Sequence, residues 1–279
     1  MSTPPIQWYP GHIAKAERLL TDQLKKVDVI LEVRDSRIPL STCHPNIQQW
    51  VGNRGRVLVM NRMDMIPEEL RLAWQAWLKR HDINPQFTDG HSGRGIKELS
   101  RAIQQAGAAI NQRRKERGML PRPIRCVVIG FPNVGKSAII NRLLGKRVVE
   151  SARKAGVTRS LRWVRISDQV ELLDAPGVLP NKLDDQAAAI KLAICDDIGQ
   201  AAYDHQRIAA HLIDLLKDLR EEQTLTDRYQ INAKEVTGET FIETLADLKN
   251  HGQKEQAANL ILNDFRIGKL GAIALERPI

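Results

Sequence analysis

The sequence predicts an α/β protein in which a mostly parallel sheet is followed by a region made only of helices. Short apolar runs rich in β-branched residues alternate with amphipathic helical patterns up to residue 185. This alternation is typical of a parallel sheet with crossover helices. From residue 186 onward the strand pattern stops and only helical patterns remain. We therefore expect two domains, residues 1–185 and residues 186–279.

The individual strands and helices can be placed in chain order. Buried strands are expected at Val27–Glu32, Arg56–Met60, Ile124–Ile129 and Val170–Leu173, and an alternating edge strand at Leu161–Ile166. Helices of the first domain are expected at Ile13–Lys25, Glu68–Arg80, Ile96–Ile110 and Ser137–Leu144. Helices of the second domain are expected at Gln186–Gly199, Tyr203–Glu222, Asn232–Val236, Thr240–His251 and Lys254–Asp264. Gly118–Pro123 interrupts the pattern, which predicts a linker or a tight connection there.

The overall composition excludes several classes of protein. The 279 residues are 42% hydrophobic and 27% charged, which is typical of a globular chain rather than a disordered one. No apolar run approaches the ~18 residues that a membrane helix needs, and the first residues lack the pattern of a secretory signal. Cys43, Cys126 and Cys195 lie far apart, which argues against a disulfide framework and a zinc module. We therefore expect a cytoplasmic protein with no membrane partner.

Positive charge is concentrated in one part of the chain. The formal net charge is +9, yet residues 111–165 alone hold 15 Lys and Arg against 2 Asp and Glu, a net charge of +13. Residues 186–279 hold 11 basic and 15 acidic side chains, a net charge of −4. A basic segment of this density favours a polyanion partner over a merely solvated face. We expect that partner to contact residues 111–165.

The segment Gly130–Ser137 (GFPNVGKS) matches the phosphate-binding pattern G-x-x-x-x-G-K-S/T. An apolar strand runs into it and a helical stretch follows, which is the context that this loop requires. Backbone N–H groups at the helix start would bind phosphate oxygens, Lys136 would bridge the β- and γ-phosphates, and Ser137 would bind Mg²⁺. The nucleotide-binding residues predicted here are Asn133, Val134, Gly135, Lys136, Ser137 and Ala138.

A second motif, Asn61-Arg-Met-Asp64, follows the predicted strand Arg56–Met60. It resembles the guanine-reading sequence N-K-x-D, with Arg62 in place of the lysine. Its side chains would emerge at the carboxyl edge of the sheet, where α/β proteins bind ligands. The Asp64 carboxylate would accept hydrogen bonds from guanine, whereas adenine would leave it unpaired at a cost of about 1–3 kcal/mol. Taken alone, N-x-x-D is also common in turns and helix caps, but its place after a strand in a chain with a phosphate loop favours guanine.

A third motif, Asp174-Ala-Pro-Gly177, follows the predicted strand Val170–Leu173 and resembles the D-x-x-G sequence of GTPases. Asp174 would hold Mg²⁺ through water, and the Gly177 N–H would sense the γ-phosphate. Thr158 lies between this motif and the phosphate loop, where a switch threonine that binds Mg²⁺ is expected. By itself the sequence could be an ordinary turn. Together the three motifs predict a site for GTP, GDP and Mg²⁺.

The order of these motifs is unusual. In an ordinary Ras-like GTPase the phosphate loop comes first, whereas here N-R-M-D at residue 61 precedes the loop at residue 130. We therefore predict a circularly permuted Ras-like P-loop GTPase domain with a C-terminal all-helical domain. Thr88, Asp89 and Gly90 occupy the place of the last guanine loop. Gly118–Pro123 would then join the ordinary termini.

With these motifs the sequence resembles the circularly permuted ribosome-assembly GTPases of the YlqF/RbgA type. The resemblance covers residues 6–180 and also rests on Trp8-Tyr-Pro-Gly-His12 with Ala14-Lys-Ala16, and on Asp35-Ser-Arg-Ile-Pro39. It implies a cytosolic GTPase that binds the maturing large ribosomal subunit and hydrolyses GTP to drive or check a late assembly step. It also implies that the helical domain contacts rRNA or ribosomal proteins, and no DNA partner is expected.

Two residues are candidates for a role in hydrolysis. The residue after D-x-x-G is Val178, which cannot orient water as the glutamine of Ras-like enzymes does. The permutation should bring His12 near the γ-phosphate, where an imidazole can orient a water, although His12 could instead only cap a helix. The resemblance also implicates His12, and it makes Asn133 a candidate ligand for K⁺ rather than an ordinary loop residue. The predicted catalytic set is His12, Lys136, Thr158 and Gly177.

Three functions are compatible with the sequence. The first is a GTPase that acts as a switch on the large ribosomal subunit. The second is a GTP-dependent RNA-binding module in which hydrolysis is incidental, which the missing glutamine favours. The third is a GTPase with a protein or membrane client, which the charge of +13 over residues 111–165 disfavours. A steep fall of affinity with salt would distinguish an RNA partner from a protein partner.

Overall fold

The protein is described by a computed structural model over residues 6, 20–145, 162–174, 180 and 184–279. A six-stranded sheet with the order β3-β2-β1-β4-β6-β5 forms its centre. Its strands are β1 (Val29–Asp35), β2 (Gly55–Asn61), β3 (Gln86–Thr88), β4 (Ile124–Ile129), β5 (Arg162–Ser167) and β6 (Val170–Asp174). All neighbours are parallel except β5, which pairs antiparallel with β6 at the edge. The carboxyl ends of the five parallel strands therefore meet at one edge of the sheet.

Both faces of the sheet are buried, which explains why β1 and β4 are nearly continuous apolar runs. Alternate residues of β1 enter different cores: Val29 and Leu31 pack in the larger core, whereas Ile30 packs in a smaller one. The larger core also contains residues of α4 (Ile96–Glu116) and α5 (Lys136–Leu144).

The smaller core lies under helical residues 20–24 and the short helix α2 (Ile47–Val51). Beside it, α3 (Glu68–Arg80) packs Trp74 and Leu78 against Leu58 and Met60 of β2. The 3-10 turn η1 (Met63–Met65) joins β2 to this helix.

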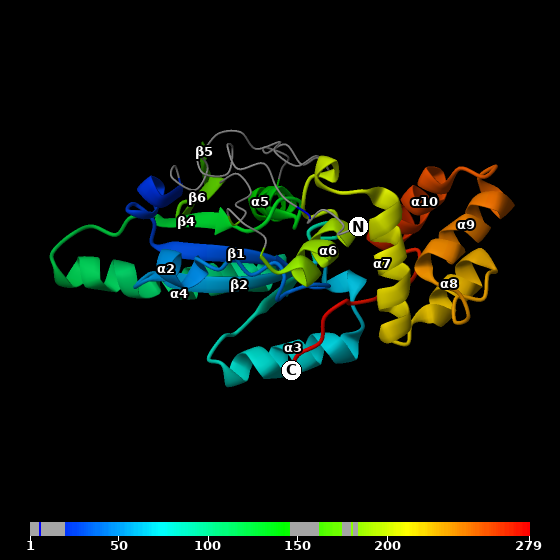
Figure 1. Cartoon of the computed structure of the whole chain (residues 1–279). Coiled ribbons are helices and arrows are strands. Elements are labelled where there is room, and N and C mark those ends of the chain that lie inside the picture. The colour runs from blue at the N-terminus through cyan, green and yellow to red at the C-terminus, as the bar shows by residue number, and fades with distance from the viewer. Residues whose placement is uncertain (1–5, 7–19, 146–161, 175–179, 181–183) are drawn as a thin grey trace.

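The C-terminal region is entirely helical within its described residues. It consists of α6 (Gln186–Ile194), η2 (Gln200–Ala202), α7 (His205–Asp218), α8 (Glu222–Tyr229), α9 (Gly238–Lys249) and α10 (Lys254–Arg266). Figure 1 shows α8, α9 and α10 grouped beyond α7 at one end of the sheet. Gly238 allows close packing here, because a Cβ atom on it would lie 2.3 Å from the carbonyl oxygen of Ala210 in α7. The apolar residues of these helices and those under the sheet form one continuous core.

The last ten residues run back from α10 to the first part of the chain. Leu275 N–H donates to the Arg37 carbonyl at 2.9 Å, and the Trp77 indole N–H donates to the Ile279 carbonyl at 2.8 Å. Figure 1 shows this segment passing from the helical region to α3. The C-terminal segment is therefore packed against the part of the chain that forms the sheet.

The α/β architecture with a C-terminal helical region is confirmed, and so are the four buried strands and the edge strand. The structure corrects the helix that we expected at Asn232–Val236, where the chain forms turns. A helix instead lies at α8, which ends with Gln230 in the left-handed conformation at φ 62°. Two short elements, α2 and β3, were not predicted. In the described part of the chain, no helix is both long and apolar enough to span a membrane.

Candidate nucleotide site

The phosphate-binding loop connects the end of β4 to the start of α5, as its sequence predicts. Gly130 adopts φ +156°, and a Cβ atom there would lie 2.3 Å from the Val33 carbonyl oxygen. Gly135 adopts φ +96°, and a Cβ atom there would lie 2.1 Å from Asn61 Nδ2. Both positions therefore require glycine. Any other residue would have a strained backbone conformation at this φ angle, and its side chain would clash with a neighbouring atom. The loop is pressed against the ends of β1 and β2.

Lys136 is the first residue of α5, and its side chain lies within this loop. Its Nζ donates to the Phe131 carbonyl at 2.7 Å and to the Gly130 carbonyl at 3.2 Å. The side chain is buried, so its ammonium group lies under the loop whose N–H groups would receive phosphate oxygens. Ser137 follows at the second helical position and is half-buried.

The Asn61 side chain connects three loops at the carboxyl edge of the sheet. Its Nδ2 donates to the Val134 carbonyl of the phosphate loop at 2.8 Å. Its Oδ1 accepts from Thr88 Oγ1 at 3.2 Å and from Gly90 N–H at 3.0 Å. The amide is buried, and it joins segments 27 to 73 residues apart in the sequence. The guanine motif, the Thr88–Gly90 loop and the phosphate loop are thus one structural unit.

Arg62 and Asp64 have different surroundings. Arg62 adopts a left-handed conformation at φ 61°, donates to the Asn133 carbonyl at 2.6 Å and pairs with Asp35 at 3.0 Å. Its guanidinium therefore bridges the phosphate loop and the end of β1. Asp64 lies in η1 and is exposed. Its carboxylate is accessible to a base bound above this loop.

Asp89 forms hydrogen bonds within the loop that follows β3. Its carboxylate accepts from the His91 N–H at 2.8 Å, the Ser92 N–H at 3.1 Å and the Ser92 hydroxyl. Burial raises the pKa of Asp89, but these hydrogen bonds together lower it by more, so the pKa lies below its usual value. Arg142 of α5 also donates to the Gly90 carbonyl at 3.3 Å. Asp89 therefore shapes the loop, and its carboxylate is already engaged.

A buried group of charges lies directly behind the phosphate loop. Asp35, at the end of β1, is fully buried and pairs with Arg37 at 2.7 Å in addition to Arg62. Burial raises the pKa of Asp35, but the charges of the two arginines outweigh it and hold the pKa below its usual range. Arg37 continues the network to the helical region, because it donates to the Cys195 carbonyl at 3.3 Å.

The segment after α6 meets this group from the other side. The Asn133 amide donates to the Asp196 carbonyl at 2.6 Å, which ties the phosphate loop to the helical region. Asp197 is fully buried, and neither of its carboxylate oxygens has a hydrogen-bond partner among the described residues. Burial, and then the charge of Asp35, raise the pKa of Asp197 well above its usual range. Burial of this carboxyl therefore favours its neutral form over its charged form.

The comparisons with known proteins agree with this geometry. The family described as "50S ribosome-binding GTPase" matches residues 125–257. The protein named Ribosome biogenesis GTPase A from Bacillus cereus is 33% identical over 98% of this chain and 94% of its own length. The chain belongs to the ribosome biogenesis GTPase A family. A relative of that name from Thermotoga maritima is 27% identical over 98% of the chain.

Solved structures show the same fold as this member of the ribosome biogenesis GTPase A family. YlqF from T. maritima bound to GNP aligns with a TM-score of 0.65 at 25% identity, over 95% of this chain and 98% of that one. A GDP-bound YlqF structure aligns with a TM-score of 0.68 at 24% identity, over 94% of this chain. The circularly permuted P-loop GTPase fold and the resemblance to the YlqF/RbgA type are therefore confirmed.

Some predicted site residues of this GTPase lie outside the described part of the chain. These are His12, Thr158 and Gly177. Of Asp174 only the main chain is described: it ends β6 opposite Val128 of β4, at the same sheet edge as the phosphate loop. Ala138 is half-buried in α5, where its Cβ would lie 3.1 Å from a Cβ placed on Gly90.

Sequence reasoning about this GTPase missed the buried group of Asp35, Arg37 and Asp197. Asp35 and Arg37 were noted only as part of the resemblance to the family. A usable signal was present, because Asp35 and Arg37 carry opposite charges at the end of a largely apolar strand and must be paired if that strand end is buried. For Asp197 the sequence offers no comparable signal.

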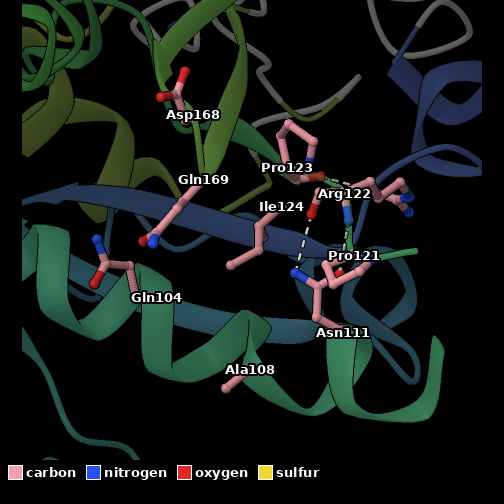
Figure 2. Close-up of a pocket in the computed structure, with 9 residues that line it drawn as sticks. All are labelled: Gln104, Ala108, Asn111, Pro121, Arg122, Pro123, Ile124, Asp168 and Gln169. Atoms are coloured by element: carbon pink, nitrogen blue, oxygen red, sulfur yellow. Dashed lines mark hydrogen bonds between the residues drawn. The ribbon is translucent and has the colours of Figure 1, made fainter. Parts of the chain in front are cut away.

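A separate cleft of about 330 Å³ lies between α4 and the start of β4. Figure 2 shows Gln104, Asn111 and Arg122 around it, with Gln169 and Asp168 on the other side. The Asn111 amide donates to the Arg122 carbonyl at 3.0 Å and accepts from its N–H at 3.2 Å. Because β4 begins here and the phosphate loop follows its other end, this cleft is not part of the nucleotide site.

Proposed function

We propose that this GTPase binds the maturing large ribosomal subunit in the cytoplasm and hydrolyses GTP to drive or check a late assembly step. The chain is a ribosome-assembly GTPase by family, and its site is formed by the guanine and phosphate loops joined through Asn61. This joined site is the observation on which the proposal rests. The matching family's description as "50S ribosome-binding" supports the large subunit as the partner.

In this proposed site Asp64 binds the base and the loop Gly130–Ser137 binds the phosphates. The exposed Asp64 carboxylate accepts from guanine, and a base without those donors leaves it unpaired on binding. The Arg62 side chain bridges Asp35 and the Asn133 carbonyl, so its aliphatic part is held beside the phosphate loop. Thr88 through its hydroxyl and Gly90 through its N–H position Asn61 within this site.

The donor set suits Mg²⁺. Ser137 supplies a hydroxyl, Thr158 a second hydroxyl and Asp174 a carboxylate, and hard oxygen ligands of this kind are those that Mg²⁺ prefers. When bound, the ion neutralises charge on the β- and γ-phosphates. For K⁺ the candidate ligand is the Asn133 amide oxygen, because Asn133 Nδ2 already donates to the Asp196 carbonyl.

Hydrolysis requires a group that orients the attacking water, and Val178 cannot supply it. We assign this role to His12, with Lys136 and the Gly177 N–H stabilising charge on the γ-phosphate. Thr158 and Gly177 would distinguish GTP from GDP. In this scheme residues 1–185 form the GTPase domain and residues 186–279 the helical domain, which contacts rRNA or ribosomal proteins.

Co-sedimentation tests the proposed partner directly. The purified protein is centrifuged with large or small ribosomal subunits, in a non-hydrolysable GTP analogue or in GDP. We expect it to pellet with large subunits in the analogue and less in GDP. Equal pelleting with small subunits, or no pelleting with either, would contradict the proposal. Lys136→Ala is the control for nucleotide dependence, since it removes the ammonium group at the phosphate loop.

A further inference from the structure

The C-terminal end of α4 carries a dense group of exposed basic side chains. Arg113, Lys115 and Arg117 lie within one turn, and all three are exposed. Among the described residues, none of the three takes part in an ion pair closer than 4.0 Å. The only acidic residue in this turn, Glu116, accepts a hydrogen bond from Gln112. We refer to residues 113–120 as the α4 tip.

The α4 tip is rigidly built. Gly118 ends the helix at φ 71° and donates to the Lys115 carbonyl at 2.9 Å, while Met119 N–H donates to the Arg114 carbonyl at 2.9 Å. This hydrogen-bond pair is a Schellman motif, which closes a helix firmly. The Arg114 Nε–H group also donates a hydrogen bond to the Leu120 carbonyl at 3.0 Å. The basic side chains are therefore mounted on a defined backbone rather than on a loose linker.

The tip also exposes apolar surface and borders the cleft of Figure 2. Leu120 is 83% exposed and Met119 is 40% exposed, which is unusual for large apolar side chains beside three cations. Behind them, Arg122 pairs with Asp28 through two contacts of 2.6 and 2.8 Å and fixes the connection to β4. The amides of Gln104 and Gln169 line the cleft (Figure 2).

The position of the tip is as informative as its charge. The connection from α4 enters β4 at Ile124, whereas the phosphate loop leaves β4 after Ile129. A strand of this length separates the two by about 20 Å. Figure 1 shows the end of α4 on the opposite side of the molecule from α9 and α10. A ligand at the tip is therefore remote from the phosphate loop, where the nucleotide is proposed to bind.

Basic residues in the last turn of a helix also interact favourably with the helix dipole, by about 0.3–1 kcal/mol each. That role does not need exposed apolar neighbours such as Leu120 and Met119. We propose that the α4 tip is an RNA-contact surface that binds phosphates through Arg113, Lys115 and Arg117 with equal strength in the GTP and GDP states. This inference rests on the proposed function, because an assembling ribosome supplies the RNA.

The test compares two triple variants in filter binding to protein-free large-subunit rRNA across a salt series. The first is Arg113→Ala/Lys115→Ala/Arg117→Ala. The control, Lys79→Ala/Arg80→Ala/Lys234→Ala, removes the same charge from exposed positions outside the tip. We expect the tip variant to bind about 10-fold more weakly and to lose about three in the slope of log affinity against log salt. The loss should be the same in the GTP analogue and in GDP, and the control should change little.

Several outcomes would overturn the inference. Equal losses in the two triple variants would mean that only total charge matters, and no loss in the tip variant would remove the surface altogether. A loss confined to the GTP analogue would place the effect at the nucleotide site. If the tip variant binds stripped rRNA normally but intact large subunits weakly, the partner is an acidic ribosomal protein instead. A different result would contradict the proposed function and support the surface: the wild type binds stripped rRNA through the tip but does not prefer large subunits.

Discussion

At the scale of single residues, the nucleotide site depends on charges buried behind it. Asp35 accepts from Arg37 and Arg62, and Arg62 in turn holds the Asn133 carbonyl of the phosphate loop. A buried ion pair contributes little net stability, but removing one partner leaves an uncompensated charge. The position of the phosphate loop is therefore sensitive to Asp35 and Arg37, which are fully buried behind it.

Replacing Arg37 tests this dependence. Arg37→Met should lower the free energy of unfolding by about 3–5 kcal/mol, because the Asp35 carboxylate loses its main partner. The double variant Asp35→Asn/Arg37→Met should recover part of that loss. Arg71→Met, which breaks a surface pair with Glu68, should cost less than about 1 kcal/mol. Urea denaturation measures all three, and equal effects of Arg37→Met and Arg71→Met would contradict the account.

The buried carboxyl of Asp197 predicts a pH dependence of stability. Its pKa is raised in the folded chain, so folding takes up a proton once the pH exceeds the ordinary value near 3.8. The wild type should therefore lose stability relative to Asp197→Asn as the pH rises, by at most about 1.4 kcal/mol per pH unit. The loss of stability should stop once the pH exceeds the pKa of Asp197 in the folded protein. Denaturation of both proteins between pH 4 and pH 8 measures it, with exposed Asp247→Asn as control, and a constant difference would contradict the prediction.

His12 is the residue that we expect to affect hydrolysis but not binding. His12→Ala should keep the affinity for GTP, because the proposed contacts to the base and the phosphates come from Asp64 and the phosphate loop. Turnover stimulated by ribosomal subunits should fall by about 10²- to 10⁴-fold, the usual range for a positioned acid–base group. Single-turnover kinetics with saturating subunits measure it. Unchanged turnover would mean that His12 only caps a helix.

The site could be predicted from sequence where a local motif determines the geometry. The two glycines of the phosphate loop, Lys136 and the guanine motif lie where their spacing predicted. The nucleotide contact predicted for Asp89 stays a prediction, and the structure adds that its carboxylate accepts from Ser92 and from the His91 N–H. Such local competition for a carboxylate cannot be judged from spacing alone. Asp197 depends on long-range packing, which no local pattern reveals.

At the scale of elements, the packing of α4 on β4 is close enough to require glycine. A Cβ atom on Gly107 would lie 2.4 Å from Ile124 Cδ1 and within 2.7 Å of two further atoms of that side chain. Ile124 is the first residue of β4 and is buried. The glycine therefore lets the helix approach the start of the strand, and it also positions the α4 tip.

Gly107→Ala tests this contact. Alanine favours a helix by about 1 kcal/mol over glycine, yet we expect a net destabilisation of about 1–3 kcal/mol because the core is overpacked. Adding Ile124→Ala should relieve the clash, so that the double variant loses less than the sum of the two single ones. Gln105→Ala on the exposed face of the same helix is the control and should change stability by less than about 0.5 kcal/mol. Stabilisation by Gly107→Ala would contradict the packing described here.

Elements with a strong period could be predicted, and short ones could not. β1 and β4 are long apolar runs, whereas β3 has three residues and only one of them is buried. This strand forms because it pairs with β2, and its own sequence has too few residues to show a strand pattern. In the helical region, α8 buries only Leu225 and Tyr229, which is too few apolar positions to establish a period.

At the scale of the whole molecule, the helical region and the sheet are built as one body. The last residues hold the two together, because the Glu276 carboxylate accepts from Leu40 N–H at 2.6 Å and pairs with Lys191 at 3.2 Å. The phosphate loop is tied to the helical region through the Asn133–Asp196 contact. The sequence separates the two regions by their patterns but contains no sign of these connections.

In the function proposed above, this GTPase acts on the large ribosomal subunit. The most direct measurement is GTP turnover by the purified protein in K⁺ buffer, alone, with large subunits and with small subunits. Slow turnover that rises many-fold with large subunits only is the predicted result, because Val178 leaves the free protein without a water-orienting glutamine. Turnover that is unchanged by large subunits, or raised equally by small ones, would contradict it.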